Sequence, residues 1–89
     1  MANHKSALKR ARQSEIRRLR NKGYKTRNKH AIKRVRTAVS ENSVDTAREH
    51  LKEAVSLIQR SASKHVIHKN KASRLISRLT ARVNQLEAS

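Results

Sequence analysis

Apolar residues recur at spacings of three and four in three segments of the chain. The middle segment carries the most regular stripe, formed by Val44, Ala47, Leu51, Ala54, Val55, Ile58 and Ala62. The last segment repeats the pattern with Ala72, Leu75, Ile76, Leu79, Val83 and Leu86. The first segment shows it only near its end, with Ala31, Ile32, Val35, Ala38 and Val39. Because such a stripe covers one face of a helix, the pattern predicts three helices that each bury one face.

The breaks between these helices are marked by polar clusters, since proline is absent and glycine occurs once. The cluster at residues 40–43 ends the first helix. It places Ser43 to cap the second helix, and Asp45 follows in the first turn, where the helix dipole favours an anion. A second cluster at residues 61–65 interrupts the apolar spacing before Val66.

We therefore predict an all-α fold in which the three helices form an up-down-up bundle, because short connections favour antiparallel neighbours. Residues 1–89 are expected to form a single domain. The first helix is expected within residues 1–40, regular from about Lys5, the second over 43–62 and the third over 66–86.

The first helix is too long for such a bundle. About 36 residues at ~1.5 Å each would extend ~54 Å, so part of the helix must project. Its amino-terminal apolar residues Leu8, Ile16 and Leu19 also lie roughly 140 to 160° around the helix from the stripe of Ile32 and Val35. The amino-terminal half therefore cannot share the core, and in the isolated protein a frayed or disordered basic tail is the alternative.

The composition excludes several classes of protein. The chain has 89 residues and no cysteine, which rules out disulfides, thiolate metal sites and a cysteine nucleophile. No apolar run approaches the ~20 residues that span a bilayer, and residues 1–12 are polar and basic without an apolar signal core. We expect an intracellular, soluble protein with no membrane partner.

The positive charge is concentrated at the two ends of the chain. Lysine and arginine total 23 against 6 acidic residues, which gives a net charge of +17. Residues 1–36 carry fourteen basic residues against Glu15 alone, a net charge of +13, whereas residues 37–63 carry −1 and residues 64–89 carry +5. Since charge this dense repels itself unless a polyanion neutralises it, we expect a nucleic-acid partner.

Phosphate contacts are expected from the basic residues of the first and third helices. Those of the first helix are Lys5, Lys9, Arg10, Arg12, Arg17, Arg18, Arg20, Lys22, Lys25, Arg27 and Lys29. In the third helix, Lys71, Arg74 and Arg78 form a ridge, and the turn of His68, Lys69 and Asn70 precedes it. Tyr24 is the only aromatic residue, so stacking platforms for splayed bases are missing and a helix laid along a folded, phosphate-rich surface is favoured.

Metal, catalytic and other binding functions find little support. His65 and His68 could share a helical face with His50 from a neighbour, but no carboxylate is spaced to complete a metal site, so no metal or cofactor is expected. Asp45, Glu49 and Glu53 lie one turn apart, as on a solvated outer face, and no enzymatic activity or small-molecule substrate is expected. A histone-like DNA compactor and a membrane-active amphipathic helix remain as alternatives.

Short motifs along the whole chain resemble those of the bacterial small-subunit ribosomal protein twenty family. They are residues 1–7, Lys9-Arg10, Gln13-Ser14-Glu15, Arg20-Asn21-Lys22 and Ile67-His68-Lys69-Asn70-Lys71-Ala72. The resemblance implies a three-helix bundle with an extended first helix that binds small-subunit ribosomal RNA directly, as an early assembly protein in the cytoplasmic ribosome. Contacts with other small-subunit proteins are left open.

Two positions depart from the family pattern. His65 stands where the family often has glycine, which puts the tight turn before the third helix in doubt, although histidine tolerates a left-handed backbone better than most residues. Ser73 stands where a second alanine is common.

Overall fold

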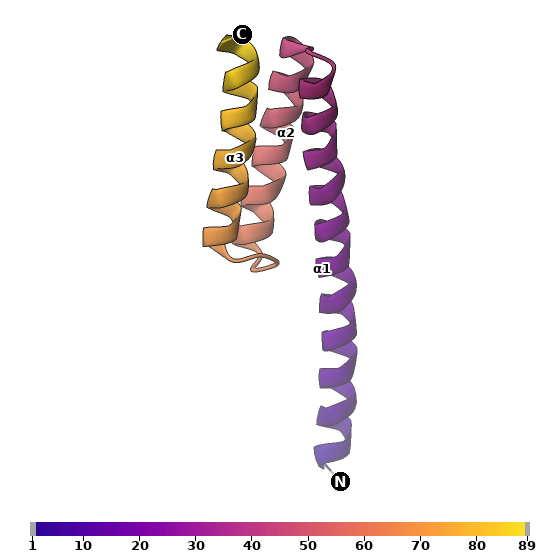
Figure 1. Ribbon diagram of the computed structural model, residues 1–89. Coiled ribbons are helices and arrows are strands. Elements are labelled where there is room, and N and C mark those ends of the chain that lie inside the picture. The colour runs from indigo at the N-terminus through magenta and orange to yellow at the C-terminus, as the bar shows by residue number, and fades with distance from the viewer. Residues whose placement is uncertain (1, 89) are drawn as a thin grey trace.

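The computed structural model describes residues 2–88, with side chains from residue 5 onward, and within that range the regular structure is entirely helical. Helix α1 spans Ala2–Ser40, α2 spans Val44–Ser63 and α3 spans Lys69–Ala88. Consecutive helices run antiparallel (Figure 1), so the predicted all-α, up-down-up arrangement is confirmed.

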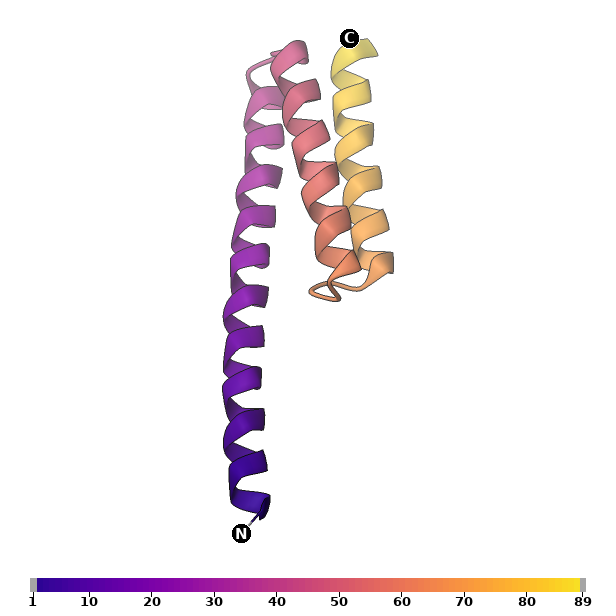
Figure 2. The ribbon, with the colours of Figure 1, turned by 180° about the vertical axis from the view of Figure 1, so that it is seen from behind.

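The core lies where the three apolar stripes meet. Its buried residues are Ala31, Val35 and Ala38 of α1, Ala47, Ala54 and Ile58 of α2, and Ala72, Leu79 and Val83 of α3. Helix α2 packs extensively against both neighbours, whereas α1 and α3 contact each other least. Figures 1 and 2 show α1 and α3 on either side of α2. Because most core residues are small, the helices come close together but bury little apolar area.

Both helix connections turn through a left-handed residue. Asn42 has φ 58° and His65 has φ 60°. After α1 the N–H of Ser43 donates to the Ala38 carbonyl, and after α2 the N–H of Val66 donates to the Ser61 carbonyl (3.0 and 2.9 Å). This pattern is the Schellman motif, which satisfies the last carbonyls of a helix. His65 therefore forms the tight turn that glycine would favour.

The predicted start of the third helix was wrong by one turn. The helix begins at Lys69 and not at Val66, because the left-handed His65 ends α2 and leaves residues 66–68 to reverse the chain. His68 then caps α3: its Nδ1 accepts a hydrogen bond from the Asn70 N–H, and its carbonyl accepts one from the Ala72 N–H (both 3.1 Å). The far ends of α2 and α3, at Ser63 and Ala88, lie one and two residues beyond the predicted ones.

The predicted N-cap position of Ser43 is confirmed, but the cap is not made by its side chain. Ser43 occupies the N-cap position of α2, but its side chain forms no cap hydrogen bond. Its carbonyl instead accepts the first helical bond from the Ala47 N–H at 2.9 Å.

The amino-terminal half of α1 projects from the bundle (Figure 1). The helix has 39 residues against 20 in each of α2 and α3, and the molecule measures 68 Å along its longest axis. Leu8, Ile16 and Leu19 are 60, 62 and 56% exposed, which confirms that the apolar residues of this half do not share the core.

Candidate nucleic-acid interface

The projecting half of α1 is helical without tertiary support. Every side chain from residue 5 to residue 20 is exposed. Alanine, leucine, glutamine, lysine and arginine dominate this stretch, and all favour the helical backbone. Its one acid, Glu15, is held by Arg18 through two hydrogen bonds of 2.7 and 3.3 Å. The acid is therefore neutralised locally and leaves the surrounding cations available to a partner.

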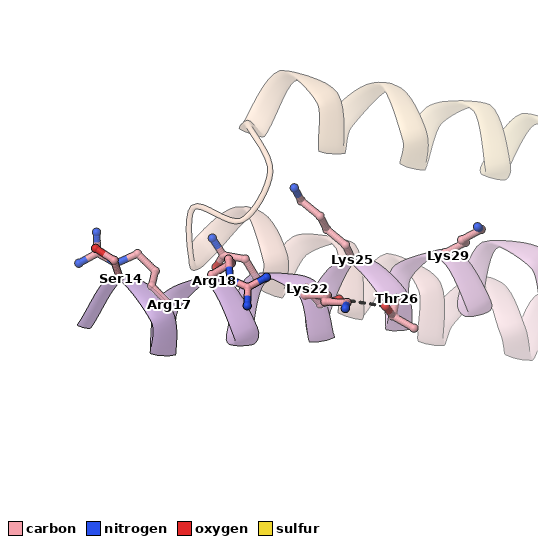
Figure 3. Close-up of a pocket in the computed structure, with 8 residues that line it drawn as sticks. Ser14, Arg17, Arg18, Lys22, Lys25, Thr26 and Lys29 are labelled. Atoms are coloured by element: carbon pink, nitrogen blue, oxygen red, sulfur yellow. Dashed lines mark hydrogen bonds between the residues drawn. The ribbon is translucent and has the colours of Figure 1, made fainter. Parts of the chain in front are cut away.

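An open groove runs along α1 where the projecting half joins the bundle (Figure 3). Its lining consists of Ser14, Arg17, Arg18, Asn21, Lys22, Lys25, Thr26 and Lys29. All five cations among them were predicted from the sequence, and no acidic side chain among residues 5–88 lines the groove. The Thr26 hydroxyl donates a hydrogen bond to the Lys22 carbonyl at 3.0 Å, so this backbone oxygen accepts from a side chain of its own helix. The groove presents several donors and positive charges along one side of α1.

A second groove lies between α1 and α3. It is lined by Lys25, Asn28, Lys29, Ile32, Lys33, Arg36, Ile67, Lys71 and Leu75. Here Lys71, a predicted contact in α3, lines the same groove as Lys25 and Lys29 of α1. Lys33 and Arg36 were not predicted as contacts. The sequence signal that could have found them is their position in α1, where each follows a residue of the apolar stripe, Ile32 or Val35.

The two grooves meet where a buried polar pair joins α1 to the end of α2. The Asn28 amide donates from Nδ2 to the Ser61 hydroxyl at 2.9 Å, and that hydroxyl lies 2.9 Å from the Leu57 carbonyl and 3.1 Å from Asn28 Oδ1. Both side chains are buried. Each residue continues an apolar stripe by one turn, Asn28 before Ala31 and Ser61 after Ile58, but both are polar. Sequence reasoning followed apolar residues only and therefore missed this pair, which marks the point along α1 where the bundle ends.

Other predicted contact residues are exposed but lie outside the two grooves. They are Lys5, Lys9, Arg10, Arg12, Arg20, Arg27, His68, Lys69, Asn70, Arg74 and Arg78. The structure thus brings Lys71 of the α3 ridge to α1 and leaves Arg74 and Arg78 on a separate part of α3. The guanidinium of Arg27 lies 4.9 Å from the centre of the Tyr24 ring, so the aromatic residue is occupied by a cation of its own helix.

His68 has a defined structural role. Its side chain is exposed. Its Nδ1 accepts the Asn70 N–H bond that caps α3, which engages one of its two ring nitrogens. Among the described residues, no group of three or more histidine and acidic side chains is placed to hold a metal ion.

Apart from Glu15, the acidic residues lie in the bundle and not in the projecting half of α1. Asp45, Glu49 and Glu53 are exposed on α2, as predicted. An ion pair between Arg48 and Glu87 joins α2 to the end of α3. The hydrogen bond from Arg48 lowers the pKa of the Glu87 carboxyl, and the same bond raises the pKa of the Arg48 guanidinium. The charge of Glu87 is thereby balanced within the bundle. No described helix is long and apolar enough to cross a membrane.

Comparison with known proteins adds independent evidence. The chain matches the family described as Ribosomal protein S20 over residues 2–84, which covers all of α1 and α2 and most of α3. It is 59% identical to the small ribosomal subunit protein bS20 of Syntrophobacter fumaroxidans over 97% of this chain and 100% of that protein. The chain belongs to the ribosomal protein S20 family. The protein of the same name from Desulfatibacillum aliphaticivorans is 56% identical over 97% of this chain and 98% of its own length.

Membership of the ribosomal protein S20 family confirms the resemblance found in the sequence motifs. The protein is a structural, non-enzymatic member of the small subunit of the bacterial ribosome, in the cytoplasm. The family match begins at residue 2, so the projecting half of α1 is part of the family sequence and is not an appended tail.

Proposed function

We propose that this chain binds small-subunit ribosomal RNA directly, through phosphate contacts from α1 and the start of α3, and stabilises the fold of that RNA during assembly. The observation that carries the proposal is the projecting half of α1, a helix with exposed cations and no protein neighbour among the described residues. The fourteen basic residues among residues 1–36 have a single acid among them, and that acid is already paired with Arg18.

The distribution of these cations around the helix determines what they can bind. At ~100° per residue, Arg12, Arg17, Arg18 and Arg20 are distributed around the circumference of α1. A helix that carries charge on all sides can contact more than one RNA backbone at once. Each neutralised phosphate releases condensed counterions, which favours binding at low salt. The helix therefore acts as a strut between neighbouring RNA segments, and the bundle fixes one end of it.

We infer the orientation of the protein on RNA from the charge of α2, whose exposed acids offset its exposed cations Arg48, Lys52 and Arg60, so that α2 lacks the net positive charge of α1. Asp45, Glu49 and Glu53 are exposed and would repel phosphates, so α2 faces away from the RNA. The same argument identifies α1 and the start of α3 as the RNA side.

Hydroxyl-radical probing from single cysteines tests this proposal, because the chain has no cysteine of its own. An iron chelate is attached to Arg18→Cys or to Glu49→Cys, and each protein is bound to a small-subunit ribosomal RNA transcript. We expect RNA cleavage mainly from position 18. The cysteine-free parental protein, treated with the same reagent, is the control. Stronger cleavage from position 49 would overturn the orientation, and failure of the parental protein to bind the transcript would overturn RNA binding itself.

A further inference from the structure

Three apolar side chains form the floor of the groove between α1 and α3, and phosphate groups alone would not bury them. Ile32 comes from α1, Ile67 from the connection after α2, and Leu75 from α3, and all three are half-buried. Five exposed cations surround this floor: Lys25, Lys29, Lys33, Arg36 and Lys71. No acidic side chain among residues 5–88 lines the groove. Its occupant must therefore combine negative charge with an apolar face.

The fold explains why this floor is open. Helices α1 and α3 both pack on α2 and contact each other least, so their facing apolar residues are only partly covered. The left-handed turn at His65 then brings Ile67 between the two helices, before α3 begins at Lys69.

The groove is continuous with the one along α1. Lys25 and Lys29 line both grooves, so an RNA strand that follows the cations of α1 reaches the α1–α3 groove without leaving the positive surface. This continuity favours a polyanion over an acidic peptide as the occupant of both.

We propose that the α1–α3 groove binds one unpaired nucleotide of the ribosomal RNA, with its base on Ile32, Ile67 and Leu75 and its flanking phosphates on the surrounding lysines. The inference rests on the proposed function. A paired base keeps both faces stacked within its helix and would leave the apolar floor in contact with water, whereas an unpaired base offers an apolar face beside its own charged backbone. The guanidinium plane of Arg36 can stack on such a base.

Asn28 adds a polar group at the edge of this site. It lines the groove, and Ser61 accepts from its Nδ2 and holds the amide in place. An amide nitrogen carries two hydrogens, so one hydrogen is left for the edge of a base. The aliphatic floor and this amide together replace the aromatic platform that the composition lacks.

The first experiment locates the nucleotide. A benzophenone amino acid replaces Leu75 on the floor or Lys71 on the rim, and the full chain is crosslinked within reconstituted small subunits. The matched control places it at Ala81, which is exposed on α3 and does not line the groove. We expect positions 71 and 75 to crosslink to the same RNA nucleotide. That nucleotide should react with a 2′-hydroxyl acylating reagent in free RNA and be protected by the parental protein.

The second experiment needs no protein variant. The crosslinked nucleotide is made abasic in the RNA fragment, which removes the base and keeps every phosphate. Affinity of the parental protein should fall by about tenfold, and the salt dependence should be unchanged. An abasic site at another unpaired nucleotide of the same fragment, one that does not crosslink, should have little effect.

The outcomes separate this inference from the proposed function. Crosslinks from positions 71 and 75 to paired nucleotides or to another ribosomal protein, or an abasic RNA that binds as tightly as the intact one, would overturn the nucleotide site alone. Failure of the parental protein to bind the intact RNA would overturn the proposed function as well.

Discussion

The two halves of α1 share one helical geometry but differ in what stabilises them. In the carboxy-terminal half, Asn28, Ala31, Val35 and Ala38 are buried against the bundle. In the amino-terminal half, every side chain from residue 5 to residue 20 is exposed. Most helical stability in proteins comes from packing of an apolar face. The carboxy-terminal half of α1 therefore depends on the protein's own core, and the amino-terminal half depends on a partner. Continuity of a helix therefore does not imply uniform stability along it.

The largest effect that separates the two regions is expected from truncating one isoleucine in each. Ile58 is fully buried in α2, so Ile58→Ala should lower the free energy of unfolding by roughly 2 to 5 kcal/mol. Ile16 is 62% exposed, so Ile16→Ala should change it by less than about 0.5 kcal/mol. Urea titrations followed by circular dichroism measure both. Equal losses in the two variants would show that the projecting half packs on the bundle.

The Asn28 and Ser61 pair tests the boundary between the regions. Asn28→Ala leaves the buried Ser61 hydroxyl with fewer partners and should cost about 1 to 3 kcal/mol of stability, as should Ser61→Ala. Because both variants break the same interaction, the double variant should lose less than the two single losses combined. Strict additivity in this double-mutant cycle would contradict a direct coupling of α1 to α2 at this point.

A smaller effect, of opposite sign, is expected at Gly23, just outside that boundary. A Cβ atom there would meet only the end of the Arg27 side chain, at 3.5 Å, which is an ordinary contact. Gly23→Ala should therefore stabilise the local helix by roughly 0.5 to 1 kcal/mol and slow amide exchange near residue 23 by up to about fivefold. Exchange in α3 serves as the internal control. Faster exchange near residue 23 in the variant would mean that the helix is strained there.

The smallest effect concerns the ion pair that closes the far end of the bundle. Arg48 lowers the pKa of Glu87 below its usual value of 4.5, so the pair stabilises the folded state above that pH and loses its contribution as pH falls through the lowered pKa. Glu87→Gln should be slightly less stable than the parental protein near pH 7, and the difference should shrink as the pH falls below 4.5 through the lowered pKa of Glu87. A constant difference across this range would contradict a charged Glu87.

The sequence predicts the helices because each core residue lies on a regular apolar stripe. It also predicts the projection, since Leu8, Ile16 and Leu19 lie on the wrong side of α1 for the core. It does not predict the start of α3, which depends on the left-handed conformation of His65. Nor does it predict the burial of Asn28 and Ser61, which depends on a hydrogen bond between two residues that are 33 positions apart in the sequence.

The candidate site is predictable only in part. Fourteen basic residues among the first 36 positions are visible in any composition count, and the cations that line the α1 groove were predicted individually. The floor of the α1–α3 groove combines Ile32, Ile67 and Leu75 from three separate segments. In the sequence, each of these residues is consistent with ordinary core packing. Only the three-dimensional arrangement of the helices shows that the three line one groove.

The central claim is that the projecting half of α1 is the main phosphate-binding element, and the salt dependence of RNA binding tests it most directly. Affinity for one folded ribosomal RNA fragment is measured over a range of salt concentrations, with circular dichroism to confirm that the bundle persists. Replacing Arg17, Arg18 and Arg20 together by glutamine should weaken binding and make the slope of log affinity against log salt shallower by roughly two to three. The matched control replaces Asp45 by asparagine and Glu49 and Glu53 by glutamine, and it should leave the slope nearly unchanged. A parental slope in the triple-arginine variant, with the bundle still folded, would contradict the claim and assign the phosphate contacts to Lys71, Arg74 and Arg78 of α3.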